Sequence, residues 1–125
     1  FLALSACATT SQGPTKALPP EFIDAVMDAA FAETIAEECR AYRYDTRREE
    51  KVLTNYAVRL AAAGYTERDL RVASARMERD PALQRKAIRM ILDRDIDVSS
   101  ESSWCAAGKR EKARGTNMGK YLLRG

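Results

Sequence analysis

The stretch "PEFIDAVMDAAFAETIAEEC", residues 20–39, decides the fold because its apolar residues recur at the spacing of one helix face. The residues of this face are Phe22, Ile23, Val26, Met27, Ala30, Phe31, Thr34 and Ile35. The dipeptide Pro19-Pro20 suits the first turn of a helix, where the missing N–H has no partner to lose. Acidic residues crowd the first turns, where they stabilise the positive end of the helix dipole. We therefore expect a first helix from about Pro20 to about Tyr42.

Two capping patterns predict the next two helices. Thr46 and Glu49 fit a capping box, in which each side chain bonds the backbone N–H of the other residue. We expect this second helix to end at Gly64. Its buried face contains Val52, Leu53, Tyr56, Ala57, Leu60 and Ala61. Thr66 and Asp69 repeat the capping pattern and predict a third helix through Met77.

The second half of the chain predicts more helix. Asp80-Pro81 marks either a new helix start or a kink, and an apolar face then continues to about Arg94. The polar stretch "DIDVSSESS", residues 95–103, predicts a connector, after which Ser103 caps a helix that Gly115 interrupts. The segment "TNMGKYLLR", residues 116–124, predicts a short last turn. No segment shows convincing strand alternation.

The first ten residues, "FLALSACATT", predict a membrane anchor. "LSAC", residues 4–7, fits the lipobox of bacterial lipoproteins, and the apolar residues before it resemble the end of a signal peptide. We expect residues 1–6 to be a signal remnant, Cys7 to be lipidated and residues 7–19 to form a flexible tether. Residues 20–125 would then form the helical domain, lipid-anchored on the periplasmic side of a bacterial membrane. The alternative is a disordered end with an accidental cysteine.

The three cysteines are consistent with export. If Cys7 carries lipid, two cysteines remain, Cys39 and Cys105. An even number of cysteines in an oxidising compartment favours a disulfide between them. Such a bond would close a loop of about 65 residues and stabilise the fold by about 4 kcal/mol. The alternatives are two separate buried thiols or a redox-active pair, although redox pairs usually lie as C-x-x-C at a helix start. The predicted fold is therefore all-α: a small bundle of four to five short helices braced by one disulfide, preceded by a flexible N-terminal tether.

The composition excludes several classes of function. The chain has 125 residues, of which 46% are hydrophobic and 31% charged, as in a single soluble globular domain. Histidine is absent, which removes the usual general base and the commonest metal ligand. No phosphate-binding glycine loop is present, and the acidic stretch "DRDID", residues 93–97, lacks the glycine of a calcium loop. We therefore expect no catalytic residue, no cofactor, no metal site and no nucleic-acid partner.

Charge is divided between the two ends of the helical part. Six acidic and no basic residues lie within residues 21–38, whereas residues 109–124 contain six basic residues and one acid. The basic side chains are candidates for contact with a partner or an anion: Lys109, Arg110, Lys112, Arg114, Lys120 and Arg124. The alternative is internal: the last helix folds back along the first, and its basic face meets the acidic one.

Two stretches resemble a known family. "CRAYRYDTRREEKVLTNYAVRLAAAGYTERDL", residues 39–70, and "WCAAGKREKARGTNMGKYLL", residues 104–123, are similar to a bacterial family of small exported proteins, domain of unknown function 5333. The matching positions at the second stretch are Cys105, Gly108, Gly115, Gly119 and Leu122. The resemblance implies export and a Cys39–Cys105 pair, and it implies no activity. The lipobox departs from the family, many of whose members carry an ordinary cleavable signal.

The sequence therefore favours a non-enzymatic envelope lipoprotein that contacts another component of the cell envelope. The contact surface would be a helix face or the basic C-terminal segment. One alternative is a thiol–disulfide redox helper, or another enzyme, that uses Cys39 and Cys105. A second alternative is a module that binds anionic lipid headgroups through the basic C-terminal segment.

Overall fold

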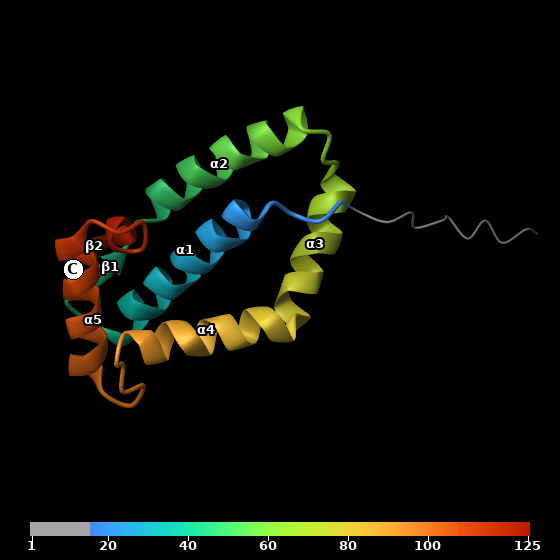
Figure 1. Cartoon of the computed structure of the whole chain (residues 1–125). Helices are drawn as coiled ribbons and strands as arrows, with labels where there is room; N and C mark the ends of the chain where they lie inside the picture. The colour runs from blue at the N-terminus through green and yellow to red at the C-terminus, as the bar shows by residue number, and fades with distance from the viewer. Residues whose placement is uncertain (1–15) are drawn as a thin grey trace, which may run out of the picture.

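The computed structural model describes residues 16–125 and confirms an all-α domain (Figure 1). The helices in this range are α1 (Pro20–Glu38), α2 (Thr46–Ala62), α3 (Glu67–Arg79), α4 (Pro81–Asp93) and α5 (Glu101–Arg114). A 3-10 turn, η1 (Gly119–Tyr121), and two short strands, β1 (Tyr42–Tyr44) and β2 (Leu122–Arg124), accompany them. Helix α1 lies inside a frame formed by α2, α3 and α4. The predicted signal remnant, Cys7 and the tether up to residue 15 lie outside the described residues.

The N-cap of α2 lies one residue before the predicted cap. Asp45, and not Thr46, is the N-cap, and its side chain accepts a 3.0 Å hydrogen bond from the Arg48 N–H. The predicted Thr46–Glu49 capping box is therefore wrong. The Asp45 N–H also donates to the Tyr121 carbonyl oxygen at 2.8 Å, so a contact with the C-terminal segment sets the position of this turn.

The starts of α3 and α4 follow their sequence signals, whereas the start of α5 does not. Thr66 and Asp69 form the predicted capping box. Asp80 caps α4, so Asp80-Pro81 is a new helix start and not a kink within one helix. Helix α5 is capped by Ser100, whose side chain accepts from the Ser103 N–H. The prediction of Ser103 as the cap is therefore wrong, since the helix begins three residues earlier.

A two-stranded ribbon replaces the predicted end of the first helix. Helix α1 ends at Glu38, short of the expected Tyr42, and Cys39 is already extended. Strand β1 pairs antiparallel with β2, with Tyr42 opposite Arg124 and Tyr44 opposite Leu122. Each strand has only three residues, too few to show an alternating pattern.

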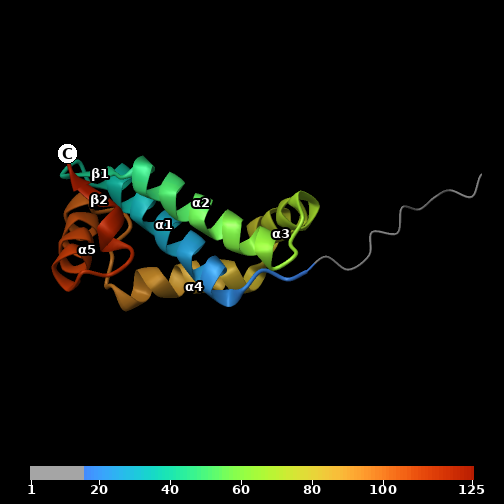
Figure 2. The ribbon, with the colours of Figure 1, turned by 90° about the horizontal axis from the view of Figure 1, so that it is seen from above.

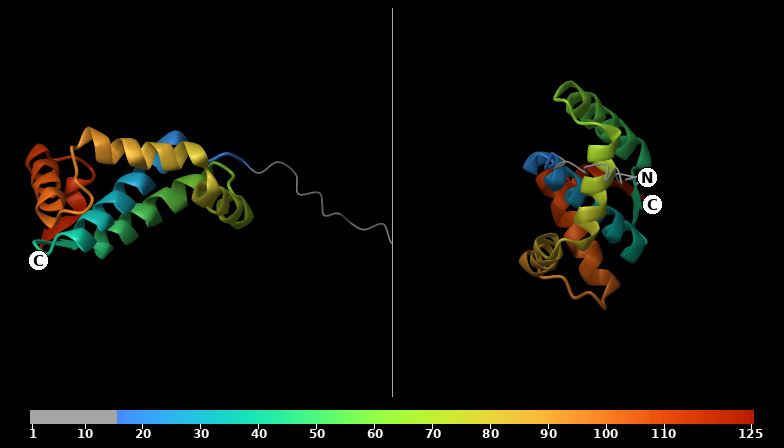
Figure 3. Two further views of the ribbon diagram at one scale, coloured as in Figure 1. Left: turned by 90° about the horizontal axis from the view of Figure 1, so that it is seen from below. Right: turned by 90° about the vertical axis from the view of Figure 1, so that its right-hand side faces the viewer.

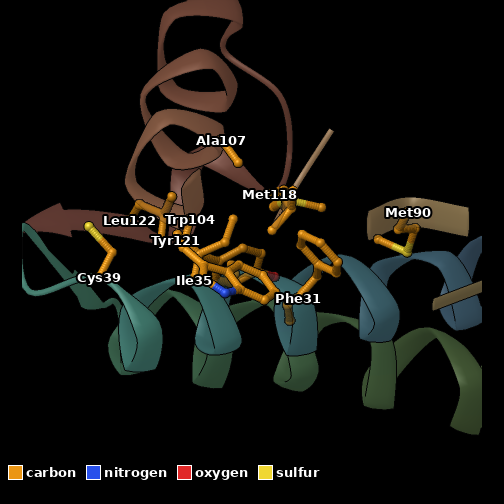
Figure 4. Close-up of a cluster of buried hydrophobic side chains, with 12 residues drawn as sticks. Phe31, Ile35, Cys39, Met90, Trp104, Ala107, Met118, Tyr121 and Leu122 are labelled. Atoms are coloured by element: carbon orange, nitrogen blue, oxygen red, sulfur yellow. The ribbon is translucent and has the colours of Figure 1, made fainter. Parts of the chain in front are cut away.

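The main core lies where α5 and the C-terminal segment meet the second half of α1 (Figure 4). Ile35, Cys39, Met118 and Leu122 are its largest fully buried side chains. Trp104 packs against Phe31, and the two ring centroids are 5.9 Å apart. The core therefore joins the first helix of the domain to its last residues.

Two glycines allow this close packing. A Cβ atom at Gly108 would lie 2.7 Å from the Tyr42 ring, so only glycine lets α5 approach β1 this closely. A Cβ atom at Gly119 would lie 2.4 Å from the Glu111 carbonyl oxygen. At both positions a side chain would collide with a neighbouring segment, so the packing around α5 requires glycine.

A second, smaller core lies at the other end of α1. Leu18, Leu60 and Ala73 are buried together, with Phe22, Ile23, Tyr65, Leu70 and Met77 packed around them. The residues just before α1 take part: the Tyr65 hydroxyl donates to the Ala17 carbonyl oxygen at 2.7 Å, and the Lys16 ammonium donates to the Ala63 carbonyl oxygen. Residues 16–19, assigned to the tether from the sequence, thus pack on the domain.

The predicted meeting of the acidic first helix with the basic last helix is wrong. Helix α5 crosses α1 steeply instead of lying along it (Figure 4). Within residues 16–125, no ion pair joins an α1 carboxylate to a basic residue of α5 or the C-terminal segment. Asp24 of α1 pairs instead with Lys86 of α4.

Candidate functional site

The two cysteines of the helical domain are bonded to each other. Cys39 and Cys105 form a disulfide, with Cα atoms 5.2 Å apart, that joins the end of α1 to the beginning of α5. Cys39 is 0% exposed and Cys105 is half-buried. Thiol–disulfide exchange requires access of an attacking thiolate to a sulfur atom. The burial of Cys39 therefore favours a structural bond.

Two of the six basic C-terminal residues donate hydrogen bonds to backbone carbonyl oxygens of the fold. Arg110 donates to the Arg94 carbonyl oxygen at 2.6 Å, and Lys112 donates to the Leu122 carbonyl oxygen. These two side chains hold the fold together. Lys109, Arg114, Lys120 and Arg124 are exposed on α5, η1 and β2.

The space between α1 and α2 is the main candidate site. These two helices run antiparallel and side by side (Figures 1 and 2). Tyr56 of α2 meets Phe22 of α1, with ring centroids 5.1 Å apart. Three of the other α1 residues at this interface are alanines, Ala25, Ala29 and Ala30, so the space between the helices is incompletely filled. The result is a groove of about 140 Å³, here called the α1/α2 groove, lined by Phe22, Ala25, Val26, Ala29, Ala30, Glu33, Glu49, Val52, Leu53, Tyr56 and Tyr121.

The α1/α2 groove is apolar with one acidic end. Glu33 lies three turns after Phe22 on α1, and Glu49 lies two turns before Tyr56 on the antiparallel α2, so the two carboxylates share an end. No Lys or Arg lines this groove, and neither carboxylate forms an ion pair within residues 16–125. The groove therefore offers an apolar floor and two unpaired negative charges.

Tyr44 lies next to this acidic end. Its ring stacks on Tyr121, with centroids 5.6 Å apart. Burial raises the pKa of the Tyr44 hydroxyl, and the nearby Glu49 and Glu33 carboxylates raise it further. The buried hydroxyl has no hydrogen-bond partner at normal distance and angle. Tyr44 is therefore part of the packed site.

A more polar pocket adjoins the α1/α2 groove and shares Val52, Tyr56 and Tyr121 with it. It is lined by Ala25, Asp28, Arg48, Val52, Tyr56, Asn117 and Tyr121 and also has a volume of about 140 Å³. Arg48 lies with its guanidinium carbon 5.5 Å from the Tyr121 ring centroid, and its buried Nε atom has no hydrogen-bond partner. Burial raises the pKa of Asp28, although the Arg94 charge lowers it in part. Burial likewise raises the pKa of Tyr121.

These side chains suit binding better than covalent chemistry. Both pockets are shaped by aromatic and alanine side chains, with a few charges at their edges. Within the described part of the chain, no three His, Cys, Asp or Glu residues are placed to hold a metal ion. The same part contains no helix with the length and hydropathy needed to cross a membrane.

Sequence reasoning missed these pocket residues. Glu33 appeared only in an acidic run, and Glu49 only as a helix cap. One local signal was available: Ala25, Ala29 and Ala30 put small side chains on the face of α1 that also carries Phe22 and Val26. A run of small residues on an apolar face leaves space opposite a partner helix. That partner is known only once α2 is placed.

The fold and the site define a small, disulfide-braced all-α domain with an open groove between its first two helices. The chain belongs to the family of unknown function DUF5333, whose model matches residues 17–123. No curated protein and no solved structure matches the chain. The family resemblance predicted from the sequence is thereby confirmed. The positions that carried it have packing roles: Gly108 and Gly119 allow close approach, Gly115 ends α5 in a left-handed conformation, and Leu122 is buried.

Proposed function

We propose that this protein is a non-enzymatic binding module of the bacterial cell envelope, anchored by lipid at Cys7, whose α1/α2 groove receives a partner. The partner presents an apolar side chain to the groove floor and a lysine or arginine to Glu33 and Glu49. The observation that carries the proposal is the unfilled apolar groove that ends in two unpaired carboxylates. Soluble domains normally fill such space, and exposed apolar surface marks interaction sites.

The envelope location is supported by two features. The "LSAC" lipobox at residues 4–7 precedes a polar segment, as in lipoproteins. The Cys39–Cys105 disulfide fits an oxidising compartment, because thiols in the cytosol stay reduced. Mass spectrometry of the chain expressed with its complete signal should show an acylated N-terminal cysteine. A Cys7→Ser variant that partitions into membranes as well as the wild type would contradict the anchor.

The groove is tested by site-specific photo-cross-linking in cells that express the full chain. Ala30 lines the groove and is exposed, so a photoreactive phenylalanine analogue there contacts the partner. Ala57 of α2 is exposed outside the groove and provides the matched control. We expect one discrete adduct from position 30 and none from position 57. Indistinguishable adducts at the two positions would overturn the groove as the binding site.

The charge requirement has its own test. Glu33→Gln combined with Glu49→Gln should weaken the adduct, whereas Glu37→Gln, an exposed residue of α1 outside the groove, should not. Ion pairs at such partly exposed sites contribute roughly 0.2–1 kcal/mol each, so two of them together correspond to a loss of up to about thirtyfold. An unchanged adduct in the double variant would remove the cationic partner from the proposal.

A further inference from the structure

Exposed apolar side chains gather on α4 and the loop that follows it. The large apolar residues left exposed in the described part of the chain are Leu53, Val58, Ile88, Leu92 and Val98, and three of these belong to α4 or the segment after it. Leu92 is 66% exposed and Ile88 is 58% exposed. They lie four residues apart, so they occupy the same face of the helix.

Two arginines lie on this face. Arg85, Ile88, Arg89 and Leu92 follow the spacing i, i+3, i+4 and i+7, and all four are exposed; they are here called the α4 outer face. Neither arginine has an ion-pair or hydrogen-bond partner in residues 16–125. The helix contains one carboxylate, Asp93, in its last residue. The α4 outer face is therefore apolar and positively charged.

The fold does not need this face for its core. Met90 is buried and Ile91 packs against the main core, so α4 attaches to the domain by its opposite side. Lys86 forms an ion pair with Asp24 of α1 on the attached side. Seen from below, α4 runs along the outside of the molecule (Figure 3, left). Its exposed leucine and isoleucine thus face away from the rest of the domain.

We propose that the α4 outer face rests on the surface of an anionic membrane. Leu92 and Ile88 insert at the boundary of headgroups and acyl chains, while Arg85 and Arg89 extend to lipid phosphates. This is the arrangement of interfacial helices, in which apolar side chains alternate with cations that reach the headgroup level. The charge of unpaired arginines selects an anionic bilayer over a neutral one. The contact is separate from the α1/α2 groove and does not require acylation of Cys7.

This surface differs from the C-terminal segment expected from the sequence to bind anionic headgroups. Arg110 and Lys112 of that segment are engaged with carbonyl oxygens of the fold. Arg85 and Arg89 have no such partners, so they remain available to lipid phosphates.

Insertion is tested by tryptophan fluorescence in the full-length Cys7→Ser chain, which lacks any acyl anchor. Leu92→Trp places an indole on the α4 outer face, and Val58→Trp, on α2, is the matched control, since these positions are 66% and 65% exposed. The native Trp104 is buried and gives the same background in both variants. With vesicles of phosphatidylglycerol and phosphatidylethanolamine we expect a blue shift for Leu92→Trp and none for Val58→Trp. Equal shifts, or none in either variant, would overturn the proposal.

Partitioning into the same vesicles tests the two components of the face. Leu92→Ser should lower the partition coefficient by roughly tenfold, whereas Val58→Ser should leave it unchanged. Arg85→Gln with Arg89→Gln should lower it by about thirtyfold, and binding should fall with added salt. The charge control is Arg47→Gln with Lys51→Gln, two exposed residues of α2 at the same spacing.

Three outcomes would contradict the membrane contact. Equal losses for the α2 and α4 charge pairs would show unspecific attraction of a basic protein. Equal binding to phosphatidylcholine vesicles would remove the role of the arginines. A dimer in sedimentation that Leu92→Ser dissociates, without vesicle binding, would show that the α4 outer face contacts a second copy of the chain.

Discussion

The Nε atom of Arg94 lies 2.7 Å from the Oε1 atom of Glu111, and the Thr116 hydroxyl donates to the second carboxylate oxygen at 2.6 Å. Glu111 is only 4% exposed. Burial alone raises the pKa of this carboxyl, but the hydrogen bonds from Thr116 and Arg94 outweigh it and hold the pKa below its usual range. Because Arg94 follows α4 and Glu111 belongs to α5, this contact joins the two helices.

Removing the Glu111 carboxylate should therefore be costly. Glu111→Ala leaves the poorly solvated Arg94 charge without its ion-pair partner, although Arg94 still donates to the Met90 carbonyl oxygen. Breaking a buried pair in this way typically costs about 3–5 kcal/mol. The control is Glu101→Ala, which breaks the solvent-exposed pair with Arg40 and should cost less than about 1 kcal/mol. Urea denaturation followed by circular dichroism measures both. Equal losses in the free energy of unfolding would contradict the structural role of the buried pair.

Asp28 should destabilise the fold at neutral pH. Its raised pKa means that the native state holds the proton more tightly than the unfolded chain, so ionisation of Asp28 opposes folding. Asp28→Asn should raise the thermal midpoint at neutral pH, and the gain should disappear below the unfolded carboxyl pKa of about 3.9. Thermal melts across this range measure the effect.

Asp97 provides a control of opposite sign. Hydrogen bonds from the Ser99 side chain and N–H lower the pKa of Asp97, so its ionised form favours the native state. Its contribution is present above the unfolded pKa and is lost as pH falls through the folded pKa. Asp97→Asn should therefore lower the midpoint at neutral pH. Changes of the same sign in Asp28→Asn and Asp97→Asn would refute this electrostatic account.

Cys39 and Cys105 should stabilise the fold through the bond between them. Cys39→Ser should lower stability by about 2–5 kcal/mol, because the bond restrains a long loop in the unfolded chain. The double variant with Cys105→Ser should behave like either single variant, since each change removes the same bond. Thermal melts with and without reductant, together with non-reducing peptide maps, test this. Cys7→Ser is the control and should keep the wild-type midpoint; a wild-type melt insensitive to reductant would contradict the prediction.

Gly119 should tolerate no side chain. Its Cβ would lie 2.4 Å from the Glu111 carbonyl oxygen and 2.8 Å from the Lys112 nitrogen, both backbone atoms that cannot move independently. Gly119→Ala should cost about 1–3 kcal/mol or more, by analogy with overpacked cores. Gly115→Ala is the matched control: φ is +64° but nothing lies within 4 Å, so only a conformational cost of about 1 kcal/mol is expected. Chemical denaturation should rank Gly119→Ala as the more damaging change.

Local signals predicted the helices, and long-range contacts account for what was missed. The apolar face of residues 20–39 and the Thr66–Asp69 capping box are complete within one stretch of sequence, and both helices formed, although α1 ends at Glu38, before the expected Tyr42. Strand β1 depends on a partner at the opposite end of the chain. Three residues that pair only with such a distant segment carry no periodic signal. The same contact places Asp45, and not Thr46, at the cap of α2.

The candidate site was less predictable than the fold. A groove forms where the side chains of two helices leave the space between them unfilled. The small Ala29 side chain indicates such space only when Val52 is known to lie on the other side of it. The charge pattern predicted pairing between the ends of the chain, but the steep crossing of α5 over α1 prevents it. Lys112 appeared available for a partner until its contact with the Leu122 carbonyl oxygen was visible. Crossing angles and backbone contacts of this kind are not encoded locally.

The pairing of β1 with β2 has a consequence for synthesis. Ile35 leaves the ribosome long before Met118 and Leu122, the residues that enclose it, have been made. The second half of α1 therefore lacks its main core until the end of translation, although Phe22 and Ile23 can pack on the smaller core earlier. Long-range pairing is also slow to form. If the chain is exported as proposed above, its main core is completed only on the far side of the membrane, once the last strand arrives.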